Sequence, residues 1–190
     1  MARWALISGE GGSDKSACAR QVADRLQAAG LRVGGYLQHK LRDEQGQKRY
    51  ELGRLGAKAE RVVLAVDGIA AKGPGEDFFC SMAFYESAFD AARRWVEEDA
   101  RAAEVLVLDG ISKLEVSGKG HCAALESALR LPEDQVVILC ARASQLSCVV
   151  ERFALDDSAM VAALEVPAEA AAVEELASAV REAVGKPRTP

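Results

Sequence analysis

The stretch Gly9-Glu10-Gly11-Gly12-Ser13-Asp14-Lys15-Ser16 lies between an apolar segment, Arg3 to Ser8, and a segment of helical periodicity. It matches the phosphate-binding loop (Walker A) pattern GxxxxGK[ST] at every fixed position except one, where Asp14 replaces glycine. In such a loop the backbone N–H groups surround phosphates, the lysine contacts the β and γ phosphates, and the hydroxyl binds Mg²⁺. The stretch therefore predicts a nucleotide-binding loop, with Lys15 as a catalytic residue and Ser16 as a metal ligand.

The alternative for this stretch is an ordinary tight turn followed by a helix N-cap. The strand before it and the helix after it are the context that a phosphate-binding loop requires, so they favour that interpretation. Asp14 opposes it, because at about 4 Å in partly screened surroundings a carboxylate repels a phosphate by several kcal/mol. Nucleotide binding therefore requires the Asp14 carboxylate to point away from the phosphates.

Apolar segments of strand length alternate with segments of helical period along the chain. This alternation predicts an α/β fold, a doubly wound, mostly parallel sheet with an inserted β-hairpin. The glycine-rich loop between the first strand and the first helix makes the arrangement P-loop NTPase-like. The strands are expected at Arg3 to Ser8, Val33 to Leu41, Lys48 to Leu55, Arg61 to Asp67, Val105 to Asp109, Gln135 to Ala141 and Ala159 to Val166.

The helices are expected to follow the loop and to separate the later strands. Their predicted positions are from Lys15 to Gly30, around Met82, Tyr85, Phe89, Ala92 and Val96, from His121 to Arg130, and after Pro167. The polar turn between the second and third strands indicates the hairpin, and the glycine-rich segment Gly68 to Asp77 is interpreted as a loop. The two most apolar later strands are expected to be neighbours of the first strand.

The composition bounds the class of protein. The chain has 190 residues, 49% hydrophobic and 28% charged, which fits a single domain over residues 1–184 and a flexible tail over 185–190. Its 24 basic and 29 acidic side chains give a net charge of −5, which argues against a general nucleic-acid-binding role. The chain has no apolar segment long enough for a signal peptide or a membrane span, so a cytoplasmic protein is expected, and no pattern identifies a protein partner.

The five cysteines are scattered without CxxC spacing and there are two histidines, so neither a disulfide framework nor a zinc site is expected. Cys18 and Cys140 lie in apolar patterns and are expected to be buried thiols in a reducing compartment. Mg²⁺ is therefore the only cofactor that the sequence indicates.

The segment Val105 to Asp109 has the form of a second metal-binding motif, an apolar strand that ends in an aspartate. Arg61 to Asp67 ends in the same way and is a rival, because an aspartate after a strand is common as a simple turn former. Asp109 is preferred because its strand is more uniformly apolar. Ser16 and Asp109 are therefore the predicted Mg²⁺ ligands.

Four segments, taken in order, resemble the family of small P-loop nucleoside-triphosphatases that includes the thermophilic and the cancer-related enzymes. Its glycine loop is similar to residues 9–17, its vGGF segment to 33–36, its arginine-bearing hairpin to 42–50 and its IDEIGxME motif to 108–115. The resemblance implies the fold described above and Mg²⁺-dependent hydrolysis of a nucleoside triphosphate such as ATP or GTP to the diphosphate and phosphate.

The sequence departs from this family at Asp14 and at Gly110, which stands where the family has the glutamate expected to position or activate the attacking water. Loss of a general base typically lowers the rate about 10²- to 10⁴-fold, so hydrolysis is expected to be slow, and restoring both residues should raise it. Glu115 matches the family's second glutamate and is a candidate catalytic residue; the alternative is an exposed acid after a turn. Arg42 and Arg49 either approach the phosphates or are solvated on the surface.

Three functions remain open at this point. The first is a nucleoside-triphosphatase in which Lys15 neutralises the γ phosphate while Ser16 and Asp109 hold the metal ion. The second is a nucleotide-binding regulator with little or no hydrolysis, which Gly110 and Asp14 favour. The third is a P-loop kinase that transfers phosphate to a small-molecule acceptor. No pattern in the sequence specifies the base of the nucleotide.

Overall fold

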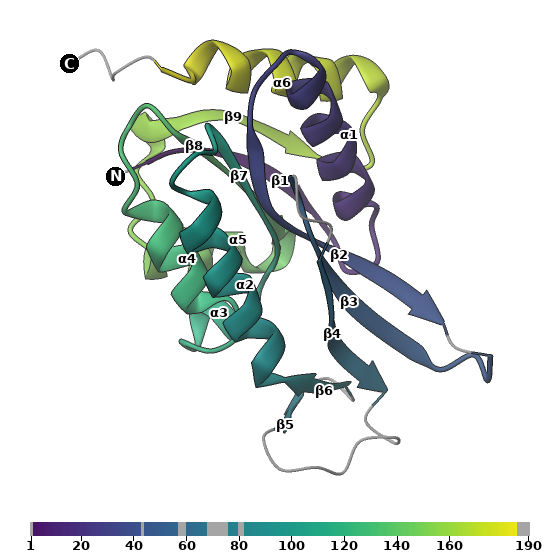
Figure 1. Ribbon diagram of the computed structural model, residues 1–190. Helices are drawn as coiled ribbons and strands as arrows, with labels where there is room; N and C mark the ends of the chain where they lie inside the picture. The colour runs from purple at the N-terminus through teal and green to yellow at the C-terminus, as the bar shows by residue number, and fades with distance from the viewer. Residues whose placement is uncertain (1, 43, 57–59, 68–75, 80–81, 186–190) are drawn as a thin grey trace.

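The computed structural model describes residues 2–42, 44–56, 60–67, 76–79 and 82–185. Within these residues the strands form one nine-stranded sheet in the order β5-β6-β4-β3-β2-β7-β8-β1-β9 (Figure 1). The parallel strands are β2 (Val33–Arg42), β7 (Val105–Ile111), β8 (Val136–Arg142), β1 (Arg3–Gly9) and β9 (Met160–Glu165). The antiparallel strands are β3 (Lys48–Arg54), β4 (Arg61–Asp67), β6 (Met82–Tyr85) and β5 (Glu76–Phe79).

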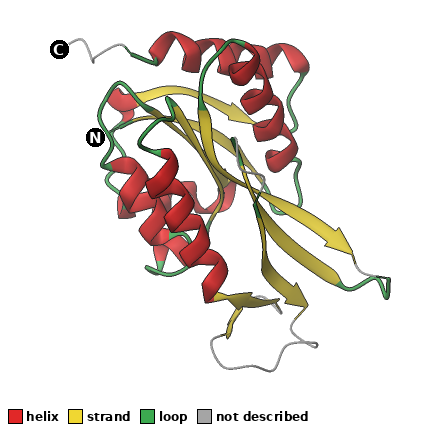
Figure 2. Ribbon diagram, in the orientation of Figure 1, coloured by secondary structure: helices red, strands yellow, loops and turns green. Residues whose placement is uncertain are grey.

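Helices cover both faces of the parallel part, as Figure 2 shows, so the predicted doubly wound α/β fold is confirmed. One face is covered by α1 (Lys15–Ala28) and α6 (Ala170–Ala183). The other face is covered by α2 (Glu86–Asp99), α3 (Lys113–Val116), α4 (Cys122–Leu129) and α5 (Leu146–Arg152). Short 3₁₀ turns at 143–145 and 157–159 complete the described elements. None of the described helices is long and apolar enough to cross a membrane.

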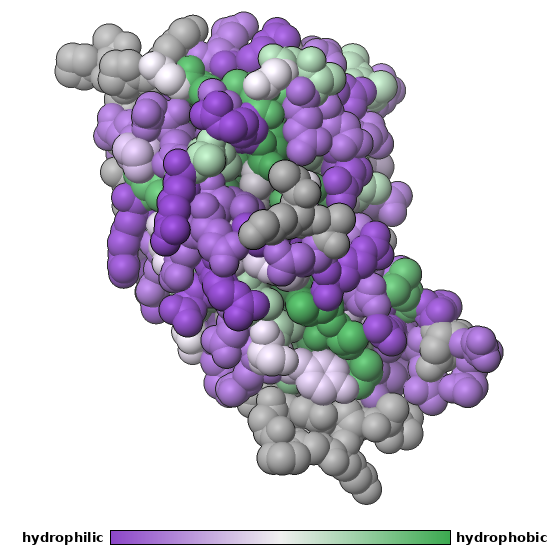
Figure 3. Space-filling model, in the orientation of Figure 1, coloured by the Kyte–Doolittle hydropathy of each residue, from purple (hydrophilic) through white to green (hydrophobic). Residues whose placement is uncertain are grey.

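The sheet separates two hydrophobic cores because successive side chains on a strand point to opposite faces. On β1, Trp4 belongs to the core under α2 and α4, whereas Ile7 belongs to the core under α1 and α6. Each of these side chains is at most 1% exposed. The surface view in Figure 3 is mainly hydrophilic, with a hydrophobic patch low over the antiparallel strands.

The strand order corrects one prediction. The strand β8 pairs with β1, as expected, but β7 does not, because β8 lies between them. The carboxyl ends of β1, β8 and β7 consequently lie side by side and carry Gly9, Arg142 and Asp109. In open α/β sheets, ligands bind in the crevice outside the carboxyl ends of parallel strands, so this edge is the expected place of a site.

The antiparallel part is larger than the predicted hairpin. The hairpin of β2 and β3 is confirmed, but Met82 and Tyr85 lie in strand β6 and not in the helix that their spacing predicted. The strand β6 pairs with β4 through Ala65 and Phe84, and the helix α2 begins at Glu86. Backbone pairing with a neighbouring strand, which no local pattern reveals, outweighed the helical period. The predicted loop at 68–77 falls mostly outside the described residues, although 76–77 begin β5, and the tail at 186–190 lies wholly outside them.

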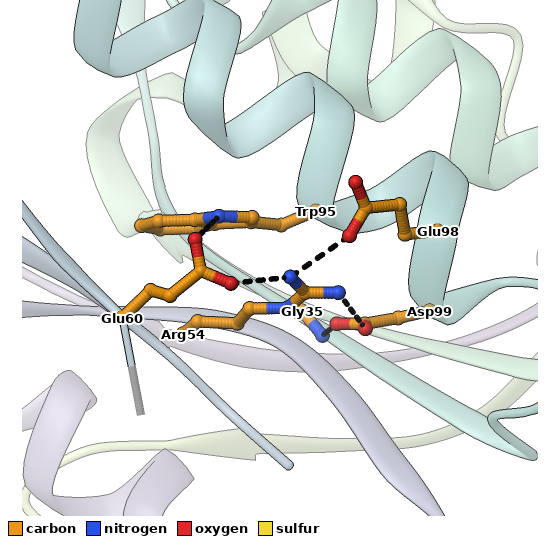
Figure 4. Close-up of polar contacts among 6 residues, drawn as sticks. All are labelled: Gly35, Arg54, Glu60, Trp95, Glu98 and Asp99. Atoms are coloured by element: carbon orange, nitrogen blue, oxygen red, sulfur yellow. Dashed lines mark hydrogen bonds and ion pairs between the residues drawn. The ribbon is translucent and has the colours of Figure 1, made fainter. Parts of the chain in front are cut away.

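An ion-pair network around the buried Arg54 side chain fixes this antiparallel part to α2 (Figure 4). The Arg54 side chain, 5% exposed, lies within 2.8 Å of Glu60, 2.9 Å of Glu98 and 2.6 Å of Asp99. The second oxygen of Asp99 accepts a hydrogen bond of 2.9 Å from the backbone N–H of Gly35 on β2. One carboxylate on α2 therefore contacts both strands of the hairpin.

Candidate functional site

The glycine-rich loop connects β1 to α1, and Lys15 is the first residue of that helix. Its ammonium group donates hydrogen bonds to the Gly9 carbonyl at 2.9 Å, the Glu10 carbonyl at 2.7 Å and the Ser13 hydroxyl at 3.0 Å. Burial lowers the pKa of Lys15 below its ordinary value, and the nearby Asp109 carboxylate opposes that change. The loop therefore wraps around the lysine ammonium and brings it close to the carboxylate at the end of β7.

Asp109 is 2% exposed, and its carboxylate joins three elements. It accepts a hydrogen bond from the Ser16 hydroxyl on α1 and one of 2.8 Å from the backbone N–H of Gln38 on β2. Burial raises the pKa of Asp109, while these hydrogen bonds and the Lys15 charge oppose the rise. The structure thus brings together Lys15, Ser16 and Asp109, whereas the rival Asp67 does not line the cavity described below.

The Ser16 hydroxyl and the Asp109 carboxylate fit Mg²⁺, which binds hard oxygen ligands and keeps several waters or phosphate oxygens of its own. Among the described residues no group of three or more His, Cys, Asp or Glu side chains could hold a metal ion alone. Cys18 and Cys140 are buried free thiols, as predicted. The donor set therefore matches a magnesium ion completed by substrate oxygens better than a closed structural metal site.

A cavity of about 790 Å³ runs along this edge of the sheet. The loop residues from Gly11 to Ser16, which follow β1, line it, and so does Asp109 on β7. Its apolar and aromatic end is lined by Leu64, Met82, Phe84, Phe89 and Leu114, of which the first three come from β4 and β6, on the opposite side of β7 from β1 in the sheet. Small-molecule sites occupy roughly 300–1,000 Å³, so the cavity is large enough for a nucleotide and for a second group beside its phosphates.

Asp14, which replaces the glycine of the loop pattern, is exposed and lines the cavity. Its φ is −80°, a value that any residue adopts, and the left-handed position in the loop belongs to Gly12, at φ +87°. The aspartate therefore introduces no backbone strain, and only its charge bears on phosphate binding.

Gly110 occupies a β-bulge, because Asp109 pairs with Cys140 and Ile111 with Ala141 on β8. Its φ is +98°, a conformation that side chains rarely adopt. A Cβ at this position would lie 1.8 Å from the amide nitrogen of Gln38. A glutamate here would therefore require the backbone of the bulge and the Gln38 side chain to adjust, and the expected gain in hydrolysis on restoring it stays a prediction.

Replacing Gly110 with glutamate is accordingly expected to lower the free energy of unfolding by about 2 kcal/mol, because it adds backbone strain at φ +98° and displaces the Gln38 carboxamide. Urea unfolding of Gly110→Glu and of Gly118→Ala measures this loss. Gly118 also has positive φ, +79°, but its Cβ would meet nothing within 4 Å. An equal loss in the two variants would mean that the Gln38 contact contributes nothing.

Glu115 is 1% exposed, so the alternative of an exposed acid after a turn is wrong. Its carboxylate oxygens accept hydrogen bonds from the backbone N–H groups of Ser112 at 2.7 Å and His121 at 2.9 Å. Burial raises its pKa to about 7. The carboxylate lines the cavity but is held by the backbone on both sides, so it shapes the cavity wall, and its catalytic role stays a prediction.

His121 borders the same cavity and was not singled out from the sequence, where it has no patterned neighbour. It is 2% exposed, stacks on Tyr36 with ring centroids 4.7 Å apart and meets the edge of Phe89 at 4.9 Å. Neither ring nitrogen has a hydrogen-bond partner among the described residues. Burial lowers the pKa of His121 to about 3, so the imidazole is neutral in the folded protein at neutral pH.

Replacing His121 with phenylalanine is expected to remove a pH dependence of stability. Between the ordinary pKa of 6.5 and the folded value of about 3, the unfolded chain binds a proton that the folded chain does not, so stability falls as the pH falls. At pH 5 this loss amounts to about 2 kcal/mol relative to pH 8. Urea unfolding of both proteins at pH 8 and pH 5 measures it, and the Glu115 titration, common to both, cancels in the difference. A difference that does not change with pH would contradict the assignment.

Arg142, at the carboxyl end of β8, is a second site residue that the sequence did not reveal. Its guanidinium lies against the loop, 2.9 Å from the position that a Cβ on Gly11 would occupy. The predicted candidates from the hairpin lie elsewhere: Arg42 donates to the Gly46 carbonyl, Arg49 pairs with Glu51, and neither lines the cavity. The sequence does show that Arg142 follows an apolar run. That this run forms β8 beside β1, the strand that precedes the loop, can be known only from the strand order.

Comparison with known protein families shows which family the chain belongs to. A family model described as NTPase matches residues 5–170. The chain belongs to the NTPase family. This NTPase is therefore a nucleotide-binding P-loop protein, as the loop and the resemblance predicted. No curated protein matches the chain.

Solved structures confirm the fold of this NTPase. A human cancer-related nucleoside triphosphatase matches with a TM-score of 0.67 and 17% identity over 94% of this chain and 95% of that chain. THEP1 from the hyperthermophile Aquifex aeolicus matches with a TM-score of 0.57 and 14% identity over 96% of this chain and 99% of that chain. At these identities the likeness concerns the fold, and the site has to be argued from the chain's own residues.

Proposed function

We propose that this NTPase hydrolyses nucleoside triphosphates, such as ATP or GTP, to the diphosphate and phosphate in a Mg²⁺-dependent reaction. The observation that carries the proposal is the convergence of Lys15, Ser16 and Asp109 in the lining of the cavity. A cation, a hydroxyl and a carboxylate in this arrangement are the groups that phosphoryl transfer on a P-loop requires.

Each residue of the site has a separate role in the proposed reaction. Residues 9–16 would bind the phosphates through backbone N–H groups, with Lys15 exchanging its loop hydrogen bonds for phosphate oxygens. Ser16 and Asp109 would hold Mg²⁺, which when bound neutralises charge on the phosphate oxygens. Arg142 adds a second positive charge beside the loop, where negative charge moves as the γ-phosphoryl group departs. Glu115, the other predicted catalytic residue, would act by holding the cavity wall through its hydrogen bonds from Ser112 and His121. The buried free thiols favour a reducing compartment such as the cytoplasm.

Phosphate release from ATP, GTP, CTP and UTP, measured with Mg²⁺ and with excess chelator, tests this function and ranks the bases. We expect phosphate release that depends on Mg²⁺ and that no other added compound increases. The proposal fails if no nucleotide gives release above a protein-free blank, and the magnesium assignment fails if the chelator leaves the rate unchanged.

Removing the charge of Asp14 is expected to strengthen nucleotide binding, because an exposed carboxylate beside the loop repels the phosphates. Asp14→Asn should lower the Kd for Mg-ADP about fivefold, the effect of one charge at close range in water. Calorimetric titration measures the Kd, with Asp24→Asn, an exposed aspartate further along α1, as the matched control. Equal Kd values for the two variants would place the Asp14 charge away from the phosphates.

A second candidate, transfer of the γ-phosphoryl group to a small-molecule acceptor, is favoured by the apolar end of the cavity. Phe84 and Phe89 line space beyond Asp109 that a water molecule does not need. ADP and phosphate are measured together while nucleoside monophosphates are added as acceptors. ADP in excess of phosphate would indicate transfer, and equal amounts would indicate hydrolysis. Binding of Mg-ATP with neither product would favour a regulator.

A further inference from the structure

The side chain of Gln38 occupies the space where a side chain at position 110 would begin. A Cβ on Gly110 would lie 1.8 Å from Nε2, 2.6 Å from Cδ and 3.1 Å from Oε1 of Gln38. Gln38 lines the cavity and is partly exposed. Within the part of the chain that the structure describes, no group hydrogen-bonds its carboxamide. The Gln38 carboxamide, with an unused donor and an unused acceptor, thus lies beside Gly110, the residue that follows Asp109 on β7.

The backbone fixes this carboxamide relative to Asp109. The strand β2 pairs with β7 only as far as Tyr36 and Leu108, and beyond that point the two strands separate. The Gln38 N–H then donates 2.8 Å to the Asp109 carboxylate across the gap. Because the main chain makes this bond, any side chain except proline at position 38 keeps it, and the carboxamide itself remains available to a ligand.

We propose that the Gln38 carboxamide holds the water molecule that attacks the γ-phosphorus. This inference rests on the proposed hydrolysis. The amide oxygen accepts a hydrogen bond from the water, and the amide nitrogen can donate to the water or to a phosphate oxygen. A glutamine can orient an attacking water without taking its proton, as the P-loop GTPases demonstrate. No group at position 110 competes for this place, because Gly110 has no side chain.

The reaction balances without a general base on the protein. The water oxygen forms a bond to the γ-phosphorus, and the bond from that phosphorus to the bridging oxygen breaks, with its electron pair leaving on the nucleoside diphosphate. One proton of the water passes to an oxygen of the departing phosphate and exchanges with solvent. Gln38 neither gains nor loses a proton, so its contribution is orientation.

Two substitutions separate this role from space filling. Gln38→Met keeps the length of the side chain and removes its hydrogen-bonding groups, whereas Gln38→Ala removes both. We expect both variants to lower single-turnover hydrolysis of Mg-ATP about 100-fold. Their Kd values for Mg-ADP and their thermal midpoints should stay at the wild-type level. The matched control is Gln21→Ala, an exposed glutamine on α1.

Gln38→Glu adds a readout that a structural residue would not move. A carboxylate in this place can take the proton of the water, so its pH–rate profile should acquire a new acidic limb that wild type lacks. Gln38→Met at the wild-type rate, with Lys15→Ala inactive, would overturn the role of Gln38 and leave the hydrolase standing. Wild type no faster than Lys15→Ala with every nucleotide would overturn both.

Discussion

Phosphate release from Mg-ATP is expected to fall about 100- to 1,000-fold when Lys15 is replaced by alanine, because the reaction loses a preorganised positive charge in a partly buried site. The ammonium already lies inside the loop, held by two carbonyls and a hydroxyl, so binding a phosphate requires an exchange of hydrogen bonds and no movement of the helix. The effect should appear in kcat and in the Kd, since the same charge meets the phosphates before and during transfer.

The control for this result is Lys113→Ala, which removes an exposed lysine of α3 outside the cavity lining. Lys15 also ties the loop together, so thermal midpoints of all three proteins are measured without nucleotide and then in excess Mg-ADP. A ligand at about 100 times its Kd should add about 2.7 kcal/mol of stability to wild type and to the control. Equal rates in the three proteins would show that the release came from elsewhere.

Replacing Arg54 with methionine is expected to lower the free energy of unfolding by about 3–5 kcal/mol, because it leaves the Asp99 carboxylate without its buried cation. Methionine keeps most of the apolar stem, so the loss reports the charge and not a cavity. Glu60 and Glu98 are much more exposed, at 46% and 41%, and water can solvate them after the change. The penalty therefore arises mainly at Asp99, which is 15% exposed.

Urea unfolding measures this loss against Arg93→Met on the same helix. Arg93 and Glu97 form an exposed pair at 3.5 Å, 48% and 47% exposed, and exposed pairs contribute at most about 1 kcal/mol. Similar losses in the two variants would mean that the network around Arg54 stabilises no more than a surface pair. A further expectation concerns the double variant. Adding Asp99→Asn to Arg54→Met should restore part of the lost stability, because it removes the carboxylate charge that has lost its cation.

Local patterns were sufficient to predict the elements of the parallel half of the fold, but not the order of its strands. The apolar runs of β7 and β8 and the glycine loop before α1 have strong signals of their own, and their bounds differ from the predicted ones by one or two residues. β6 was mistaken for the start of α2 because its residues also satisfy a helical period, and only pairing with β4 distinguishes the two. Whether such a segment forms a strand or a helix depends on pairing partners that are distant in sequence.

The same distinction applies to the site. Lys15 and Asp109 were found because each ends or begins an element with a recognisable motif, and the structure brings them together. Arg142, His121 and Gln38 carry no motif. Their position at the cavity depends on which strands are neighbours and on where β2 separates from β7. Neither of these can be predicted from the residues that surround them in the sequence.

The contact between Gln38 and the bare backbone of Gly110 also constrains how this chain can have evolved. A side chain at 110 needs a smaller or redirected one at 38, together with a bulge that relaxes from φ +98°. Among homologues the two positions should therefore covary, with glutamine at 38 found beside glycine at 110. A chain carrying a side chain at 110 together with Gln38 would need the Gln38 carboxamide to move aside and would bear the backbone strain of the bulge, so such an intermediate is less stable than one carrying neither polar group.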